Sequence, residues 1–465
     1  MPIPIAQLTH VVEALQSALP GRVNTDPAEL ASYTIDRSGH RSAGVPLAAV
    51  SPQTIEDVQT VCRIASAARV PLVSRGAGTG LAGGAVAGAG EIVLSLTDMD
   101  RILEISPENR LAVVQPGILN CQLNSVLADY RLWWAPDPAS KDISTVGGNI
   151  AMNAGGLLCA KYGVTREAVL ALKVVLADGT LLSVGHRTVK GVTGYDLSAL
   201  MIGSEGTLGI IVEATLKLQP VPEGDTVTIG AFFDSVEEAA AAAGTVTTSG
   251  LVPSIMELMD GRTLECVAKY TGQDLLSSGG AYLLIQSDGP AAADTAGRIA
   301  ELALNAGGRV ETTTDPAESQ RLLDLRRSAF PALEAMGTML VEDIAVPRSK
   351  MTEAFAAIRR LEDKYGLVIA TTCHAGDGNL HPTFVFDGTD VPPKVWSAAG
   401  ELFATALELG GTLTGEHGVG LLKRKWLQDE LGQAQYAIQR RIKEVFDPHN
   451  LLNPGKVFLD GTLTV

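Results

Sequence analysis

Two short clusters near the C-terminus hold the residue types best able to do chemistry. The first is His374-Ala-Gly-Asp-Gly-Asn-Leu-His381 and the second is Gly415-Glu416-His417-Gly418. Together they contain three of the seven histidines in the chain, with a carboxylate beside one of them. Two imidazoles and one carboxylate suit Zn²⁺, Mn²⁺ or Fe²⁺ and leave coordination positions open for substrate or water. The clusters therefore predict a metal-dependent enzyme with one imidazole left over as a base.

The spacing of the first cluster predicts a bend. His374 and His381 are seven residues apart, so a straight strand would place them on opposite faces. The Gly-Asp-Gly-Asn between them disfavours a helix and favours a tight turn, which can bring both imidazoles to one point. Glu416 and His417 are adjacent, so one can face the metal and the other the substrate. The competing interpretation, ordinary histidines flanked by turns, is weaker because glycine-flanked polar clusters make poor core.

Three glycine-rich segments upstream predict a groove for a large nucleotide cofactor. In the first, residues 74–84 follow a predicted strand, and seven of the fifteen residues from Gly76 to Gly90 are glycine. Such a loop can turn several N–H groups inward and form an anion site suited to a pyrophosphate. The second and third segments, residues 145–156 and 203–210, again combine glycine with hydroxyl, amide or carboxylate side chains.

The first loop also matches a dinucleotide fingerprint by spacing alone. Gly78, Gly80 and Gly83 have the required separation, and Asp98 lies about 20 residues further on. That fingerprint needs a helix to begin within it. Here glycine continues to Gly90 and a strand is predicted at residues 92–96, which leaves no room for the helix. An NAD site is therefore disfavoured, and a purely structural glycine loop is the other alternative.

Hydrophobic periodicity predicts two regions of mixed α and β structure, separated near Gln219-Pro-Val-Pro-Glu-Gly. In the first region the Asp178-Gly179 turn predicts a hairpin. In the second region strands and helices predict an α+β plan with an antiparallel sheet. The first region has predicted helices at 5–19 and 54–68 and strands at 47–50, 71–74, 92–96, 110–114, 169–176 and 181–184; the second has strands at 226–233, 255–259, 282–286, 309–313 and 367–372 and helices at 236–247, 291–306, 353–364 and 395–409.

Length, composition and charge limit the classes of protein to which the chain can belong. A chain of 465 residues predicts two or three domains. The net charge of -16 disfavours nucleic acid or an anionic membrane as a partner. The sequence contains no run of about 18 apolar residues, so no membrane span is predicted. The five cysteines stand singly, so neither a disulfide framework nor iron–sulfur ligands are expected. We expect a soluble, cytoplasmic protein.

Several motifs together resemble a known family. Besides the three glycine segments and the two histidine clusters, they include Pro136-Asp-Pro-Ala-Ser140, Lys190-Gly-Val-Thr-Gly-Tyr-Asp196 and Asn453-Pro-Gly-Lys456. The chain resembles the FAD-linked oxidoreductases of the vanillyl-alcohol-oxidase superfamily. Within it, the resemblance is greatest to the branch of D-lactate dehydrogenase, the glycolate oxidase flavoprotein subunit and D-2-hydroxyglutarate dehydrogenase. It spans nearly the whole chain.

The resemblance implies an α+β fold. A two-part FAD-binding domain of the PCMH type would occupy residues 1–220, an α+β substrate cap with an antiparallel sheet residues 221–410, and a C-terminal segment, 411–465, would return to the FAD domain. The FAD would be non-covalent, because no histidine or cysteine lies near the first loop to tether it. The implied FAD contacts are Arg75, Gly76, Ala77, Gly78, Thr79, Gly80, Leu81, Pro138, Ser140, Thr145, Gly148, Asn149, Asn153, Glu205, Gly206, Ile211 and Asn453.

The resemblance also implies roles in the two clusters. His374, His381 and Glu416 would bind the metal, and His417 would be the base. The metal would hold the 2-hydroxyl and one carboxylate oxygen of the substrate, His417 would remove the hydroxyl proton, and C2 would pass hydride to flavin N5. Asn379 would fix the substrate or a metal ligand.

An arginine is expected to bind the substrate carboxylate. Arg326 stands at the position that the resemblance implies, with Arg327 and Arg348 as alternatives. In the hydroxyglutarate branch a threonine and a lysine stand where this chain has Phe330 and Val341, so a second carboxylate would lack a partner. The expected substrate is therefore a D-2-hydroxy monocarboxylate, namely D-lactate, a longer apolar homologue or glycolate.

Other functions stay open. The chain could be the flavoprotein subunit of a glycolate oxidase complex, a D-2-hydroxyglutarate dehydrogenase, or a non-catalytic metal- or nucleotide-binding protein. In each of the enzymatic interpretations, electrons must leave the flavin for an external acceptor. That acceptor would be a quinone, a cytochrome, an electron-transfer flavoprotein or an iron–sulfur subunit. A homodimer is left open.

Overall fold

The computed structural model describes residues 5–459, and these fold into two compact units. Among the described residues, the first unit comprises 5–154, 164–221 and 416–459. The second comprises residues 155–163 and 222–415. The chain therefore passes between the units at Val221, at Gly415 and at both ends of the short segment 155–163. No helix among the described residues is both long and apolar enough to cross a membrane.

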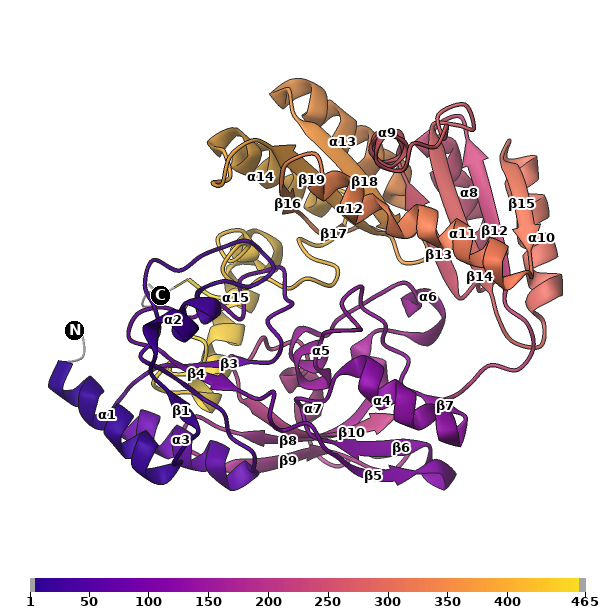
Figure 1. Ribbon diagram of the computed structural model, residues 1–465. Coiled ribbons are helices and arrows are strands. Elements are labelled where there is room, and N and C mark those ends of the chain that lie inside the picture. Colours follow the sequence, from indigo (N-terminus) through magenta and orange to yellow (C-terminus); the bar gives the residue numbers. More distant parts are fainter. Residues whose placement is uncertain (1–4, 460–465) are drawn as a thin grey trace. The chain divides into compact units, whose positions relative to one another are not determined.

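One part of the first unit is a four-stranded sheet (Figure 1). Its order is β1 (Val23–Asn24), β2 (Ala48–Val50), β4 (Ile92–Ser95) and β3 (Leu72–Arg75). Strands β2, β4 and β3 are parallel. Helix α1 (Ile5–Ala18) packs against α3 (Ile55–Ala67), whose first turn is closed by a capping box of Thr54 and Asp57. The glycine loop between β3 and β4 contains no helix, as the argument against an NAD site requires.

The other part of the first unit is a five-stranded antiparallel sheet. Its order is β5 (Ile102–Ser106), β6 (Leu111–Val114), β10 (Ile210–Lys217), β8 (Val169–Val175) and β9 (Leu181–Gly185). The predicted hairpin is present, and Gly179 in its turn has φ +87°. Helix α5 (Val146–Met152) buries Val146 and Ile150 in the core of this sheet. Further elements of the unit are α2 (Pro27–Leu30), α4 (Asn120–Leu127), β7 (Leu132–Trp133), α7 (Leu197–Met201), β11 (Gln219–Pro220) and α15 (Leu427–Phe446).

The second unit is built on an eight-stranded sheet (Figure 1). All of its strand pairs are antiparallel, which confirms the predicted α+β plan. Its order is β15 (Arg309–Thr313), β12 (Val227–Phe233), β14 (Ala281–Ser287), β13 (Ile255–Met259), β18 (Val368–His374), β19 (Asn379–Phe386) and β16 (Thr338–Val341), with β17 (Ile344–Ala345) also on β19.

Two groups of helices cover this sheet. Helices α9 (Gly261–Thr271), α11 (Pro316–Arg327) and α12 (Ala329–Glu334) share one apolar core with its strands. Helix α8 (Val236–Thr248) packs against α10 (Ala292–Asn305) and α13 (Met351–Tyr365), and α13 packs against α14 (Pro393–Glu408). The short helix α6 (Cys159–Tyr162) joins this unit through an ion pair of Lys161 with Asp288. The centre of the sheet, where β13, β18 and β19 lie side by side, carries the site residues described next.

Candidate active site

The hairpin of β18 and β19 brings the two histidines of the first cluster together. In its register His374 lies opposite Asn379, and Thr372 lies opposite His381. Because Asn379 and His381 are two residues apart on one strand, all three side chains share a face of the sheet. The imidazole centroids of His374 and His381 are 5.0 Å apart, edge to face. The bend is therefore present, and Gly378 in its turn has φ +79°.

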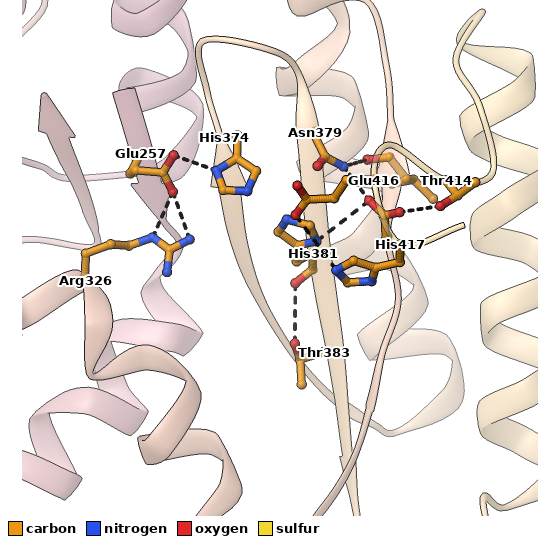
Figure 2. A network of polar contacts seen from close by, with 11 residues as sticks. Glu257, Arg326, His374, Asn379, His381, Thr383, Thr414, Glu416 and His417 are labelled. Carbon is orange, nitrogen blue, oxygen red and sulfur yellow. Dashed lines mark hydrogen bonds and ion pairs between the residues drawn. The ribbon is translucent and has the colours of Figure 1, made fainter. Parts of the chain in front are cut away.

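A buried glutamate orients the first of these histidines. Glu257 on β13 lies opposite His374 in the sheet, and its Oε1 is 2.6 Å from His374 Nδ1. Its Oε2 accepts hydrogen bonds from Arg326 Nε at 3.2 Å and Nη2 at 2.9 Å. Figure 2 shows Glu257 between Arg326 and His374. Sequence reasoning missed Glu257, although an acidic residue inside the apolar run Ile255-Met-Glu-Leu-Met259 was a usable signal.

The three candidate arginines differ in their surroundings. Arg326 lies in the last turn of α11, and its side chain is 15 % exposed. Its Nε and Nη2 face Glu257, which leaves the other edge of the guanidinium, formed by Nη1 and Nη2, for a further acceptor. Arg327 is exposed, and Arg348 Nη1 donates to the carbonyl of Gly376 in the hairpin turn. Among these three, Arg326 is the one joined to the histidine pair through Glu257.

Asn379 is held by groups that sequence reasoning did not identify. Its Nδ2 donates to Asp343 Oδ1 at 2.6 Å and to the carbonyl of Ile344 at 2.9 Å. Asp343 is fully buried, and its Oδ2 accepts from Thr414 Oγ1 at 2.5 Å. Asp343 Oδ1 also lies 3.8 Å from His381 Nδ1. These contacts fix the side chain of Asn379 and dock residue 414 onto the hairpin (Figure 2).

The second cluster begins directly after this docked segment. Gly415 lies so close to Asn379 that a Cβ there would be 2.3 Å from its Nδ2. Glu416 and His417 follow as the first residues of the C-terminal segment of the first unit, and Glu416 Oε1 is 3.9 Å from His417 Nε2. Gly418 has φ +88°, and a Cβ there would be 2.5 Å from Met152 Cε. Glycine is required on both sides of the pair because the backbone is closely packed at each position.

The three glycine segments meet within the first unit. A Cβ on Gly76 would lie 2.2 Å from Thr145 Oγ1, so the first loop touches the start of α5. The third loop also reaches α5, because Gly203 N donates to the carbonyl of Ile150 at 3.0 Å. A Cβ on Gly206 would lie 2.5 Å from Ser74 Oγ. Three segments that are far apart in the sequence are therefore in contact with one another in the first unit.

The C-terminal tail returns to the same region. Asn453 Oδ1 accepts from the backbone N–H of Ser74 at 3.2 Å, and its Nδ2 donates to the carbonyl of Glu205 at 2.7 Å. The carboxylate of Glu205 accepts from the N–H groups of Val419 and Gly420, each at 2.7 Å. Burial raises the pKa of Glu205 to about 7. Asn453 and Glu205 thus join the first loop, the third loop and the tail.

The other residues implied as FAD contacts lie in the first loop, around α5, in the turn before it and in β10. Arg75 braces its own loop, because its Nη1 donates to the carbonyls of Ile35 and Ala85, and burial lowers the pKa of Arg75. Asn153 ends α5 in a left-handed conformation, and Thr145 caps its start by accepting from Gly148 N. The remaining members lie in the loops themselves (Ala77, Gly78, Thr79, Gly80 and Leu81), in the turn before Thr145 (Pro138 and Ser140) and in strand β10 (Ile211).

Three buried polar atoms in this region lack hydrogen-bond partners among the described residues. They are Ser144 Oγ, Asn149 Nδ2 and Lys456 Nζ. Lys456 is 3 % exposed, and burial lowers its pKa to about 8. A buried ammonium without an acceptor is costly, so the donors fit a polar, anionic ligand. Asn149 belongs to the set implied as FAD contacts, whereas Lys456 ends the motif Asn453-Pro-Gly-Lys456 and was not predicted to bind FAD.

Comparison with known proteins gives the class. Residues 46–185 match an FAD binding domain, and residues 223–457 match the C-terminal domain of FAD linked oxidases. The fold is shared with the 4-ethylphenol oxidase of Gulosibacter chungangensis, at a TM-score of 0.78 and 20% identity with 98% of each chain covered. p-Cresol methylhydroxylase gives 0.77 and 19%, again over 98% of each chain. The protein is therefore an FAD-linked oxidoreductase with the predicted two-domain PCMH-type fold.

Proteins with similar sequences show the family to which the chain belongs. The chain is 41% identical over 422 residues to the glycolate oxidase subunit GlcD of Bacillus subtilis, with 89% of each chain covered. It is 37% identical over 410 residues to a D-lactate dehydrogenase of Archaeoglobus fulgidus, covering 88% and 90%. A D-lactate dehydrogenase of Anaerostipes hadrus is 34% identical over 462 residues, covering 96% and 97%. The chain belongs to the FAD-linked oxidase family.

Proposed function

We propose that this protein is an FAD- and divalent-metal-dependent dehydrogenase that oxidises a short D-2-hydroxy monocarboxylate, such as D-lactate or glycolate, to the 2-oxo acid. The observation that carries the proposal is the pair of imidazoles on one hairpin face, with His374 oriented by Glu257 beside Arg326. The names of the relatives, D-lactate dehydrogenase and glycolate oxidase subunit, agree with it.

The proposed metal ligands are His374, His381 and Glu416, each of which offers one ligand atom. Glu416 is included because it directly follows Gly415, which packs on Asn379. Consecutive Cα atoms are about 3.8 Å apart, so the backbone of Glu416 stays near the hairpin. A second set, Asp343, His381 and His417, has similar ligand types. It fits less well, because both carboxylate oxygens of Asp343 already accept hydrogen bonds.

The chain's own residues would bind and deprotonate the substrate. The free edge of Arg326 would hold the substrate carboxylate in a bidentate pair. His417 would accept the hydroxyl proton on an imidazole nitrogen, as a neutral imidazole does near pH 7. Asn379, fixed by Asp343, would position the substrate or a ligand. When bound, the metal would polarise the 2-hydroxyl and FAD would take the hydride from C2.

The proposed FAD contacts are the loop and tail residues that meet in the first unit. Residues 75–81 would offer backbone N–H groups to the pyrophosphate, and Asn149 would use its unsatisfied amide. The binding would be non-covalent. The preference for a monocarboxylate rests on Phe330 and Val341, two apolar residues that offer no partner to a second carboxylate.

A purified sample provides the test. We expect it to be yellow and to bleach anaerobically with D-lactate or glycolate but not with D-2-hydroxyglutarate. A sample that binds no flavin, or a flavin that no 2-hydroxy acid reduces, would contradict the proposal.

Replacing the base separates binding from chemistry. His417→Ala should keep FAD and metal but slow flavin reduction by about 10²- to 10⁴-fold, because general-base catalysis is lost. Metal content and stopped-flow reduction measure the two effects. If His417→Ala lost the metal instead, the second ligand set would be the correct one.

A second candidate is the flavoprotein subunit of a glycolate oxidase complex, favoured by the name of the Bacillus subtilis relative. In that case electrons would leave to an iron–sulfur partner. Co-purification of the tagged chain with a cysteine-rich subunit would support this candidate. Full turnover by the isolated chain with a quinone, a cytochrome or an electron-transfer flavoprotein would support a self-sufficient dehydrogenase.

A further inference from the structure

We propose that Glu257 is a positioning residue that orients two parts of the reaction site at once, the metal ligand His374 and the substrate-binding Arg326. The inference rests on the proposed function and extends it, because Glu257 would link metal affinity to substrate affinity.

The contacts of Glu257 divide cleanly between its two oxygens. Oε1 lies 2.6 Å from His374 Nδ1, and Oε2 accepts both hydrogen bonds from Arg326. The side chain of Glu257 is 1 % exposed and sits on a central strand of the sheet. Its backbone is fixed as well, because it is opposite His374 in β18 and opposite Leu284 in β14. The carboxylate therefore has little freedom to turn away from either partner.

The contact with Oε1 decides which nitrogen of His374 can bind a metal. An ionised carboxylate only accepts hydrogen bonds, so Nδ1 must carry the proton. The lone pair is then on Nε2, which is the atom left to face a cation. Carboxylates that orient ligating histidines in this way commonly change metal affinity by 10- to 100-fold when removed.

The contact with Oε2 decides how Arg326 can bind a carboxylate. Because Nε and Nη2 are used on Glu257, the guanidinium plane is fixed and the edge of Nη1 and Nη2 remains for the substrate. Arg326 in turn balances the charge of Glu257, which would otherwise be a buried anion. A purely structural ion pair would need only the arginine, whereas here the same carboxylate also binds the histidine.

The experiment uses the FAD-loaded protein, stripped of metal by chelation and titrated with Mn²⁺ alone by calorimetry. In Glu257→Gln the amide offers one acceptor and one donor, so it cannot accept from both His374 and Arg326. We expect the Mn²⁺ affinity to fall about 10- to 100-fold and the KM for the 2-hydroxy acid to rise, with FAD content unchanged. Arg326→Gln should raise KM and lower the Mn²⁺ affinity less than Glu257→Gln does, since the contact of Glu257 with His374 remains. Glu311→Gln, a surface strand carboxylate of the same sheet paired with Arg321, is the matched control and should change neither quantity.

The outcomes separate this inference from the proposed function. If the wild-type protein binds Mn²⁺ no better than His374→Ala, the proposed metal site itself is wrong. If wild type binds Mn²⁺, His374→Ala does not, and Glu257→Gln matches wild type in both quantities, only the role of Glu257 is overturned. Should Glu257→Gln fail to fold, Glu257→Asp keeps both oxygens on a shorter side chain. A folded Glu257→Asp with wild-type Mn²⁺ affinity and KM would overturn the role equally.

Discussion

At the scale of single residues, the buried charged groups differ in whether the chain satisfies them. Glu257 has partners for both oxygens, and so does Glu205. Lys456 is equally buried, but its ammonium lacks a hydrogen-bond acceptor among the described residues. Unsatisfied buried charge is rarely kept without a use. Glu91 and Asp36 are close enough to stabilise the charge of Lys456, but neither accepts a hydrogen bond from it. We predict that an anionic group of bound FAD supplies that acceptor.

This contrast predicts a pH dependence of FAD binding. The pKa of Lys456 is lowered to about 8 in the free protein, and an anionic ligand favours the charged form. FAD affinity should therefore be constant below about pH 8 and fall as the pH rises above it, by up to about tenfold per unit. Lys456→Met should bind FAD about tenfold more weakly at pH 7 and lose this pH dependence. Fluorescence titration of the apoprotein between pH 7 and 9.5 measures both.

The control for this titration is Lys350→Met, which removes an exposed lysine paired with Glu353 in the second unit. Its FAD affinity should follow the wild-type curve. If Lys456→Met also followed that curve, Lys456 would not contact FAD.

Sequence reasoning identified some members of the polar cluster around the hairpin and missed others for a physical reason. His374, His381 and Asn379 stand within one short cluster, so their joint chemistry is visible locally. Glu257 lies 117 residues from His374, and Asp343 lies 36 residues from Asn379. These partners meet only when the strands pair, and a single sequence does not show which strands will be neighbours.

At the scale of elements, the β18–β19 hairpin brings together two histidines that stand seven residues apart in the sequence. Its turn needs Gly378, which has φ +79° and is so close to Val346 that a Cβ would lie 2.3 Å from its carbonyl oxygen. Both the backbone conformation and the space exclude a side chain there.

Gly378→Ala should therefore damage the fold and the site together. We expect a loss of about 1 to 3 kcal/mol in the free energy of unfolding, from the strain and the clash, and a loss of bound metal. Gly366→Ala is a matched control, because Gly366 also has a positive φ, +57°, but has nothing within 4 Å of a Cβ. The control should lose about 1 kcal/mol and keep the metal. Denaturant unfolding and metal analysis distinguish the two variants, and equal metal content in both would contradict the role of the hairpin.

Elements with a clear hydrophobic period could be predicted from the sequence. Elements rich in glycine or polar residues could not. Strands β13 and β15 have the predicted bounds, Ile255–Met259 and Arg309–Thr313. Helix α5 was missed because its sequence contains two glycines and has low helix propensity. The cap at Thr145 and the buried Val146 and Ile150 stabilise it instead. Strand β19 was missed because it begins with polar site residues.

At the scale of the whole molecule, the glycine loops and the histidine hairpin belong to different units. The residues that meet at the glycine loops belong to the first unit, and the histidine hairpin belongs to the second. Glu416 follows the second unit directly and begins the C-terminal segment of the first. Removing the metal should therefore leave FAD bound. After dialysis against a chelator, we expect the flavin absorbance per chain to stay unchanged, whereas release of FAD with the metal would show that the two sites depend on each other.

The most direct test of the proposed reaction is anaerobic flavin reduction by D-lactate and glycolate, followed by stopped flow in the same preparation before chelation, after chelation and after Mn²⁺ is restored. We predict rapid bleaching at first, a loss of at least about 10²-fold on removal of the metal, and recovery when Mn²⁺ returns. Bleaching at the same rate without any metal would contradict a metal-dependent oxidation of the 2-hydroxyl group.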